Sequence, residues 1–127
     1  MKIHKFSKFI SIFFLTILIV RILVLIVQEK SLMVLGYEVH HMYPGIVLVL
    51  ISGFSRFFSK NWKINNFDLT LFAIGSGLII DEVVFLVFTR GNHSDYFSLI
   101  SNLGAIVLAA AFAIIFYVIY KYEIKPR

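Results

Sequence analysis

Residues 9–27 read FISIFFLTILIVRILVLIV, an apolar run in which Arg21 is the one charged residue. A helix of roughly 20 apolar residues crosses the hydrocarbon core of a bilayer, which is about 30 Å thick. The run therefore predicts a membrane-spanning helix. Its basic start resembles a signal peptide, but the apolar run is too long and residues 27–30 offer no small-residue cleavage site. We expect this first span to be retained.

Three more apolar stretches follow. They predict further spans at about 43–58, 67–89 and 96–120. The runs 46–51 and 105–111 lack the polar stripe that a helix of a soluble bundle would show. The composition agrees, because 60% of the residues are hydrophobic and 15% are charged, against about 45–50% and 25% in soluble proteins. We expect an all-α membrane protein: a bundle of four transmembrane helices that forms one integral membrane domain over residues 1–127.

The basic residues predict the orientation of this bundle. Nine of them fall on the side of the two termini: Lys2, Lys5, Lys8, Arg56, Lys60, Lys63, Lys121, Lys125 and Arg127. The opposite side has only Lys30 and Arg90. Positive charge stays on the cytoplasmic side, so both termini are expected inside, with the chain in the plasma (cytoplasmic) membrane. The net charge of +5 is thereby explained, and no nucleic-acid partner is expected. The expected partners are the lipid bilayer and either a second copy or another membrane protein.

Polar residues gather in one layer of the predicted bundle. A rise of about 1.5 Å per residue places them roughly 8–12 Å below the outer edge of the hydrocarbon core. The layer contains Arg21 of the first span, Asp81 and Glu82 of the third, and Ser101 and Asn102 of the fourth, with His40 and His41 just before the second. Charged groups at this depth are costly when they face lipid. We expect them to face the bundle interior and to pair with one another.

Asp81 and Glu82 are the strongest functional candidates, because acidic residues inside a membrane are usually functional. Their roles would be proton exchange, general acid–base catalysis or cation binding. Arg21 can neutralise one carboxylate, and the other needs a bound proton, a protonated histidine or a metal cation. Ligand-binding roles are expected for the polar residues nearest this pair: Arg21, Asn102, Ser101 and Tyr43. The alternative is an Arg–Asp/Glu layer that only fixes the helix packing.

A metal site is a weaker hypothesis. His40, His41 and Glu82 would supply a mixed nitrogen and oxygen ligand set for zinc, manganese or iron. The spacing matches no established ligand motif, and the chain has no cysteine. The alternative is that the histidines are polar residues at the membrane surface, one of which caps the second span or bonds to Glu82.

Three functions from different classes remain open. The first is a membrane-embedded enzyme that acts on a lipid or another amphiphile. The second is an oligomeric component for proton or ion transport, although no polar path continues into the inner half. The third is a structural or accessory subunit.

Local signals add expectations for the loops and helix ends. The outer loop Gln28–His41 could form a short interfacial helix or a hairpin-like flap. Asn66 and Ser94 are expected to cap the third and fourth spans. Pro44 in the first turn of the second span predicts non-helical backbone over residues 40–43.

Overall fold

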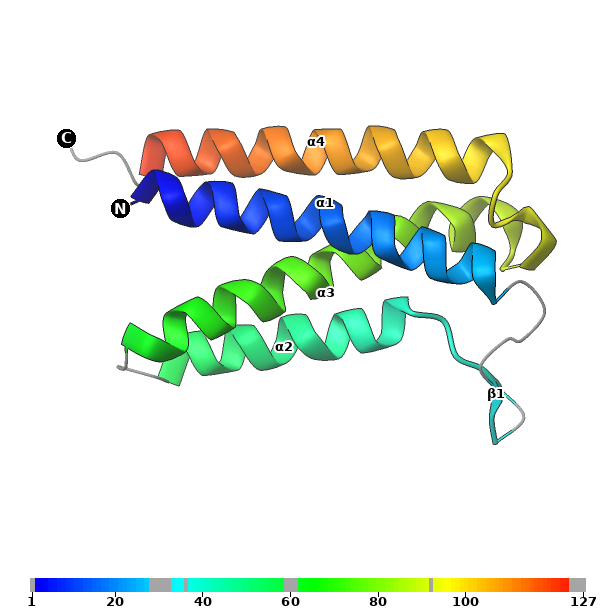
Figure 1. The fold of residues 1–127 in the computed structure, drawn as a ribbon, viewed down its shortest axis with the longest axis horizontal. Helices are drawn as coiled ribbons and strands as arrows, with labels where there is room; N and C mark the ends of the chain where they lie inside the picture. The colour runs from blue at the N-terminus through cyan, green and yellow to red at the C-terminus, as the bar shows by residue number, and fades with distance from the viewer. Residues whose placement is uncertain (1, 28–32, 36, 59–61, 92, 124–127) are drawn as a thin grey trace.

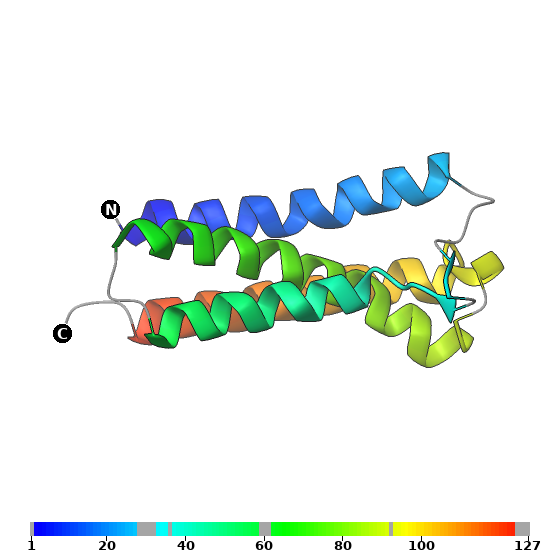
Figure 2. The ribbon, with the colours of Figure 1, turned by 90° about the horizontal axis from the view of Figure 1, so that it is seen from below.

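The computed structural model describes residues 2–27, 33–35, 37–58, 62–91 and 93–123. These ranges contain four α-helices: α1 (Lys2–Ile26), α2 (Met42–Phe58), α3 (Trp62–Thr89) and α4 (Leu99–Glu123). The helices run alternately up and down, and both termini lie at the same end of the bundle (Figures 1 and 2). A short hairpin lies at the opposite end, where β1 (Met33–Val34) pairs antiparallel with β2 (Tyr37–Glu38). A 3₁₀ turn, η1 (His93–Asp95), precedes α4.

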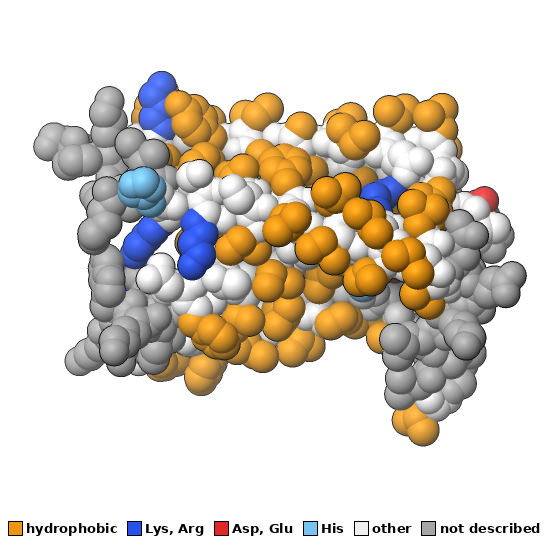
Figure 3. All heavy atoms as spheres, viewed as in Figure 1, with side chains coloured by type: hydrophobic (Ala, Val, Ile, Leu, Met, Phe, Trp, Pro, Cys, Tyr) orange, Lys and Arg blue, Asp and Glu red, His pale blue; other side chains and the backbone are white. Residues whose placement is uncertain are grey.

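Three of these helices are long and apolar enough to cross a membrane. The best windows in α1, α3 and α4 have mean hydropathies of 2.9, 2.2 and 2.5. The fourth, α2, is apolar but has only 17 residues, a length of about 26 Å. Hydrophobic side chains cover the middle of the molecule in Figure 3, and most of the visible Lys and Arg side chains lie at the end with the termini. This surface is compatible with a membrane location.

α3 is the central helix and packs against each of the other three. Its closest neighbour is α2, because glycines face each other where these two helices meet. A Cβ atom placed on Gly75 would lie 2.6 Å from the carbonyl oxygen of Gly45. Small residues let the backbones of two membrane helices approach this closely, and van der Waals contact then holds the helices together. The two glycines therefore set the spacing of α2 and α3.

The change Gly75→Val tests this contact. We expect it to lower the free energy of unfolding by about 1–3 kcal/mol, because the added side chain cannot fit without moving α2. Gly53→Val is the matched control, since a Cβ at Gly53 would meet nothing within 4 Å. Thermal unfolding of the detergent-purified variants, followed by circular dichroism, measures both. Equal effects of the two substitutions would contradict the assignment.

Aromatic rings fill the space between α1, α3 and α4 toward the end with the termini. Phe9 and Phe13 of α1 are almost fully buried. Phe9 stacks on Phe116 of α4, with ring centroids 4.6 Å apart, and on Phe72 of α3 at 5.8 Å. This apolar half of the bundle holds the helices in register, so that their polar residues meet at the other end.

The helix boundaries differ from the expected ones in several places. α3 begins at Trp62, so Asn66 lies inside the helix and does not cap it. α4 is capped by Ser98, whose hydroxyl accepts the Ser101 N–H at 3.3 Å, and Ser94 lies in η1 instead. α2 begins at Met42, before Pro44, because a proline in the first turn loses no helical hydrogen bond. The expectation of non-helical backbone was therefore wrong for residues 42 and 43. Of the two expectations for the outer loop, the described residues confirm the hairpin.

Candidate functional site

The polar residues of all four helical regions meet at the end opposite the termini. Arg21 lies in the last turns of α1, and Asp81 and Glu82 lie in the second half of α3. His40 and His41 directly precede α2, and Asn102 lies in the first turn of α4. We call these residues, together with Tyr96, the polar cluster. Side chains of the predicted polar layer thus come together at one end of the bundle.

Asp81 is the centre of the cluster and has no exposed surface. Arg21 donates from Nε to Oδ1 at 2.6 Å. His41 Nε2 lies 3.0 Å from Oδ2, and the Tyr96 hydroxyl donates to the same oxygen. Three partners from separate segments of the chain thus hold one buried carboxylate. Such charge-assisted bonds stabilise its ionised form.

Arg21 is fixed by further contacts. Its Nη1 donates to Oδ1 of Asn102, and its guanidinium carbon lies 5.0 Å from the centre of the Tyr96 ring. Asn102 is itself oriented, because its Nδ2 donates to the carbonyl oxygen of Phe97 at 2.9 Å. The arginine therefore connects α1 with both α3 and α4.

Glu82 is the second buried acid and holds the start of α2. Its Oε2 accepts the backbone N–H of Met42 at 2.6 Å, and its Oε1 lies 2.8 Å from His40 Nδ1. The first amide groups of a helix have no partner within the helix, and the positive end of the helix dipole favours an acid there. Glu82 thus caps α2 from a neighbouring helix.

His41 lies between the two acids. Its Nε2 is 3.0 Å from Asp81, and its Nδ1 is 3.3 Å from Glu82 Oε2. With neutral imidazoles, the described cluster has two negative charges and only one positive charge, that of Arg21. An imidazole that carries a proton on each nitrogen can donate on both sides and makes the cluster neutral. The side chain of His41 is 21% exposed, whereas those of the acids are 0% and 4% exposed.

The geometry does not support the metal hypothesis. Among the described residues, no three His, Asp or Glu side chains are arranged to hold a metal ion. The reason is that His40 pairs directly with Glu82, and His41 pairs with both Glu82 and Asp81. Ligand atoms on one tetrahedral zinc lie about 3.3 Å apart, whereas His40 Nδ1 and Glu82 Oε1 are 2.8 Å apart. The nitrogens and oxygens pair with each other and do not surround a common centre.

Two of the expected ligand-binding residues lie outside the hydrogen bonds of the cluster. Ser101 lies directly before Asn102 in α4 and is completely buried, as expected for a residue of the polar layer. Its hydroxyl, however, has no hydrogen-bond partner in the described part of the chain. The same holds for Nη2 of Arg21. Tyr43 is 53% exposed, and its ring lies 6.4 Å from the His40 ring. The structure therefore brings Arg21, Asn102 and the two acids together, and leaves Tyr43 at the rim.

Sequence reasoning missed two members of the site. As the first residue of the fourth predicted span, Tyr96 suits the outer membrane interface, where tyrosines are common, but it is 2% exposed and bonds to Asp81. The sequence carried no signal for this contact, because six residues, about 9 Å of helix, separate Tyr96 from Asn102. The other is the Met42 N–H, a backbone group that no residue motif marks.

No protein family, no curated protein and no solved structure shows significant similarity to this chain.

Proposed function

We propose that the protein is a four-span integral membrane protein, with both termini in the cytoplasm, whose polar cluster binds and releases a proton near the opposite face of the membrane. The observation that carries this proposal is the position of His41 between two buried carboxylates, within 3.0 Å of one and 3.3 Å of the other. The proton held by His41 is the exchangeable one.

The membrane placement has separate support. α1, α3 and α4 each have the length and hydropathy of a span, and their surfaces carry many exposed large hydrophobic side chains. α2 is short for a span, but it lies beside α3 along its length and Glu82 caps its first turn. With its end capped in this way, a helix of about 26 Å reaches across most of the hydrocarbon core. The distribution of Lys and Arg sets the orientation.

The groups around His41 make it the natural point of proton entry. It faces Asp81 and Glu82 of α3, and Arg21 of α1 and Tyr96 contact the same Asp81 carboxylate. His40 reaches Glu82 from the other side. Because the acids are buried and the imidazoles are partly exposed, a proton from outside meets an imidazole first. His41 and Glu82 would then act as acid and base toward a bound molecule.

Arg21 also has an unused donor for such a molecule. Nη2 of Arg21 and the hydroxyl of Ser101 are buried without a hydrogen-bond partner among the described residues. A buried donor is stabilised when it finds an acceptor. An oxygen of an amphiphile, for example of a lipid head group, would satisfy Arg21, and this favours acid–base catalysis on an amphiphile over proton transport.

A structural role is the second candidate. Arg21, Asp81 and Asn102 connect three helices through direct bonds, which is the pattern of a layer that fixes helix packing. On this alternative the cluster stays in one protonation state as long as the protein is folded.

Nuclear magnetic resonance of ¹⁵N-histidine-labelled protein distinguishes the two. We expect the ¹⁵N signals of His41 to change with pH while the helices stay folded by circular dichroism. His41→Gln assigns the signals, and the exposed His4 is the internal control. A His41 signal that does not change with pH while the protein stays folded would overturn the acid–base proposal.

A further inference from the structure

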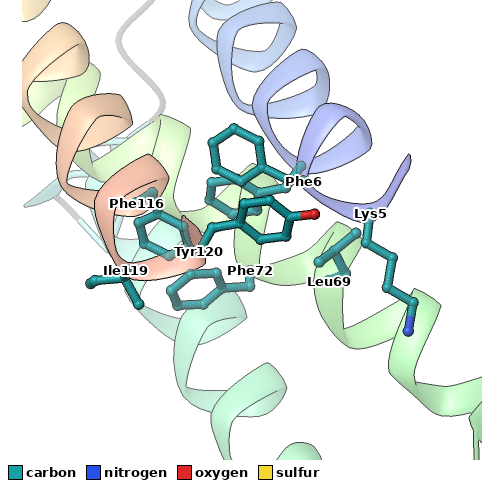
Figure 4. A pocket seen from close by; sticks show the side chains of 8 residues that line it. Lys5, Phe6, Leu69, Phe72, Phe116, Ile119 and Tyr120 are labelled. Atoms are coloured by element: carbon teal, nitrogen blue, oxygen red, sulfur yellow. The ribbon is translucent and has the colours of Figure 1, made fainter. Parts of the chain in front are cut away.

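A second feature lies at the opposite end of the bundle, far from the polar cluster. A cavity of about 220 Å³ opens between α1, α3 and α4. The residues that line it are Lys5, Phe6, Phe9, Leu69, Phe72, Phe116, Ile119 and Tyr120. Figure 4 shows the rings of Phe6, Phe72, Phe116 and Tyr120 gathered around it. The lining surface is apolar.

The aromatic rings that line this cavity pack against one another. Phe6 stacks on Tyr120 with centroids 4.9 Å apart, and Phe72 lies 5.8 Å from Phe116. Phe9 stacks on Phe116 behind them. Rings fixed by their neighbours cannot move inward to fill the space, and an empty space deprives its walls of van der Waals contacts. The cavity is therefore suited to a flexible apolar chain.

The cavity has a charged edge and an apolar interior. Lys5 lies in the first turns of α1, and its ammonium group points away from the rings in Figure 4. Phe9 and Phe116 lie one helical turn deeper, which is about 5.4 Å along the helix. Lysine side chains place their methylenes on apolar surface and their charge at the level of the lipid head groups. Lys8 and Lys121 are exposed at the same end, so the positive charge there is shared by α1 and α4.

We propose that this cavity binds an acyl chain of an anionic phospholipid from the leaflet on the side of the termini, with the phosphate next to Lys5. The cavity is apolar inside and carries a positive charge at its edge. It therefore complements a lipid that has an apolar chain below a negative head group. The inference rests on the membrane placement and does not depend on acid–base chemistry at the polar cluster.

The first test varies the head group. Purified protein in detergent micelles is given phosphatidylglycerol or phosphatidylcholine with identical acyl chains, and the unfolding temperature and the lipid retained in native mass spectrometry are measured. We expect phosphatidylglycerol to bind more tightly and to raise the unfolding temperature more. Lys5→Gln should weaken its binding about fivefold, the effect of one lysine near an anionic lipid. Lys8→Gln is the matched control, because Lys8 does not line the cavity.

The second test fills the cavity. Leu69→Phe should abolish the retention of lipid while the unfolding temperature without lipid is unchanged or higher. Leu15→Phe is the control, because Leu15 lies on α1 away from the cavity and is 53% exposed. Ile119→Phe, at the cavity edge, replaces Leu69→Phe if that variant does not fold. Equal binding of the two lipids, an equal effect of Lys5→Gln and Lys8→Gln, or normal retention in the filled variant would each overturn the proposal. The histidine titration is independent of all these outcomes.

Discussion

Arg21→Leu is expected to lower the free energy of unfolding by about 3–5 kcal/mol, the usual loss when one partner of a buried ion pair is removed. Arg21 Nε lies 2.6 Å from Asp81, whose side chain is completely buried. Without the guanidinium, the described donors left to the carboxylate are His41 and Tyr96, and Oδ1 of Asn102 loses the donor from Arg21. Unfolding must be measured within the micelle. The arginine is then inserted in both the folded and the unfolded state, so the free-energy cost of inserting it cancels.

The double variant Arg21→Leu/Asp81→Asn provides the decisive comparison. It removes both charges, so we expect it to recover most of the stability lost in Arg21→Leu. Arg56→Leu is the matched control, because Arg56 is exposed in α2 and bonds to no part of the cluster. Additive losses in the double variant would show that Arg21 and Asp81 are not energetically coupled, and the described pair would then contribute little.

Glu82→Leu is expected to produce the second-largest effect, a loss of about 3 kcal/mol. The substitution leaves the Met42 N–H without its acceptor and removes the partner of His40. Glu82→Gln is the matched variant, because its amide oxygen can still accept the Met42 N–H. We expect it to lose less than half as much stability as Glu82→Leu. Thermal unfolding measures both losses. A Gln variant as unstable as the Leu variant would contradict the capping role.

Much of the fold follows from the sequence because lipid-facing helices need uniform apolar runs. Small residues of α3 also lie where the helices pack closely. Ala73 and Gly77 lie on the face of α3 that leads to Asp81, and a Cβ on Gly77 would approach the backbone of Phe13 to 3.0 Å. The ends of the helices were less predictable, because the apolar pattern stops before the helix does. α3 therefore starts five residues before the predicted span, at Trp62.

The layer of the site could be predicted, but its pairing could not. Depth follows from residue counting, and charge dictates that Arg21 meets an acid. Which acid it meets depends on the rotation of α3, and neighbouring helix residues point about 100° apart. Asp81 consequently faces α1, whereas Glu82 faces the start of α2. The sequence also does not reveal that Tyr96 turns inward, because an aromatic residue at a helix start suits a membrane surface equally well.

The ion pair between α1 and α3 joins residues sixty positions apart. In a membrane, the ribosome delivers the arginine well before its acid has been made. In the proposed membrane placement, the first helix therefore enters the bilayer before Arg21 has its acid, and the position of Arg21 near the helix end lets the guanidinium reach head-group water in the meantime. Asp81 is synthesised later, with the third helix, and its carboxylate then pairs with the Arg21 guanidinium in place of that water. In the proposed placement, a chain released before α3 is made would leave Arg21 of the first helix without its acid.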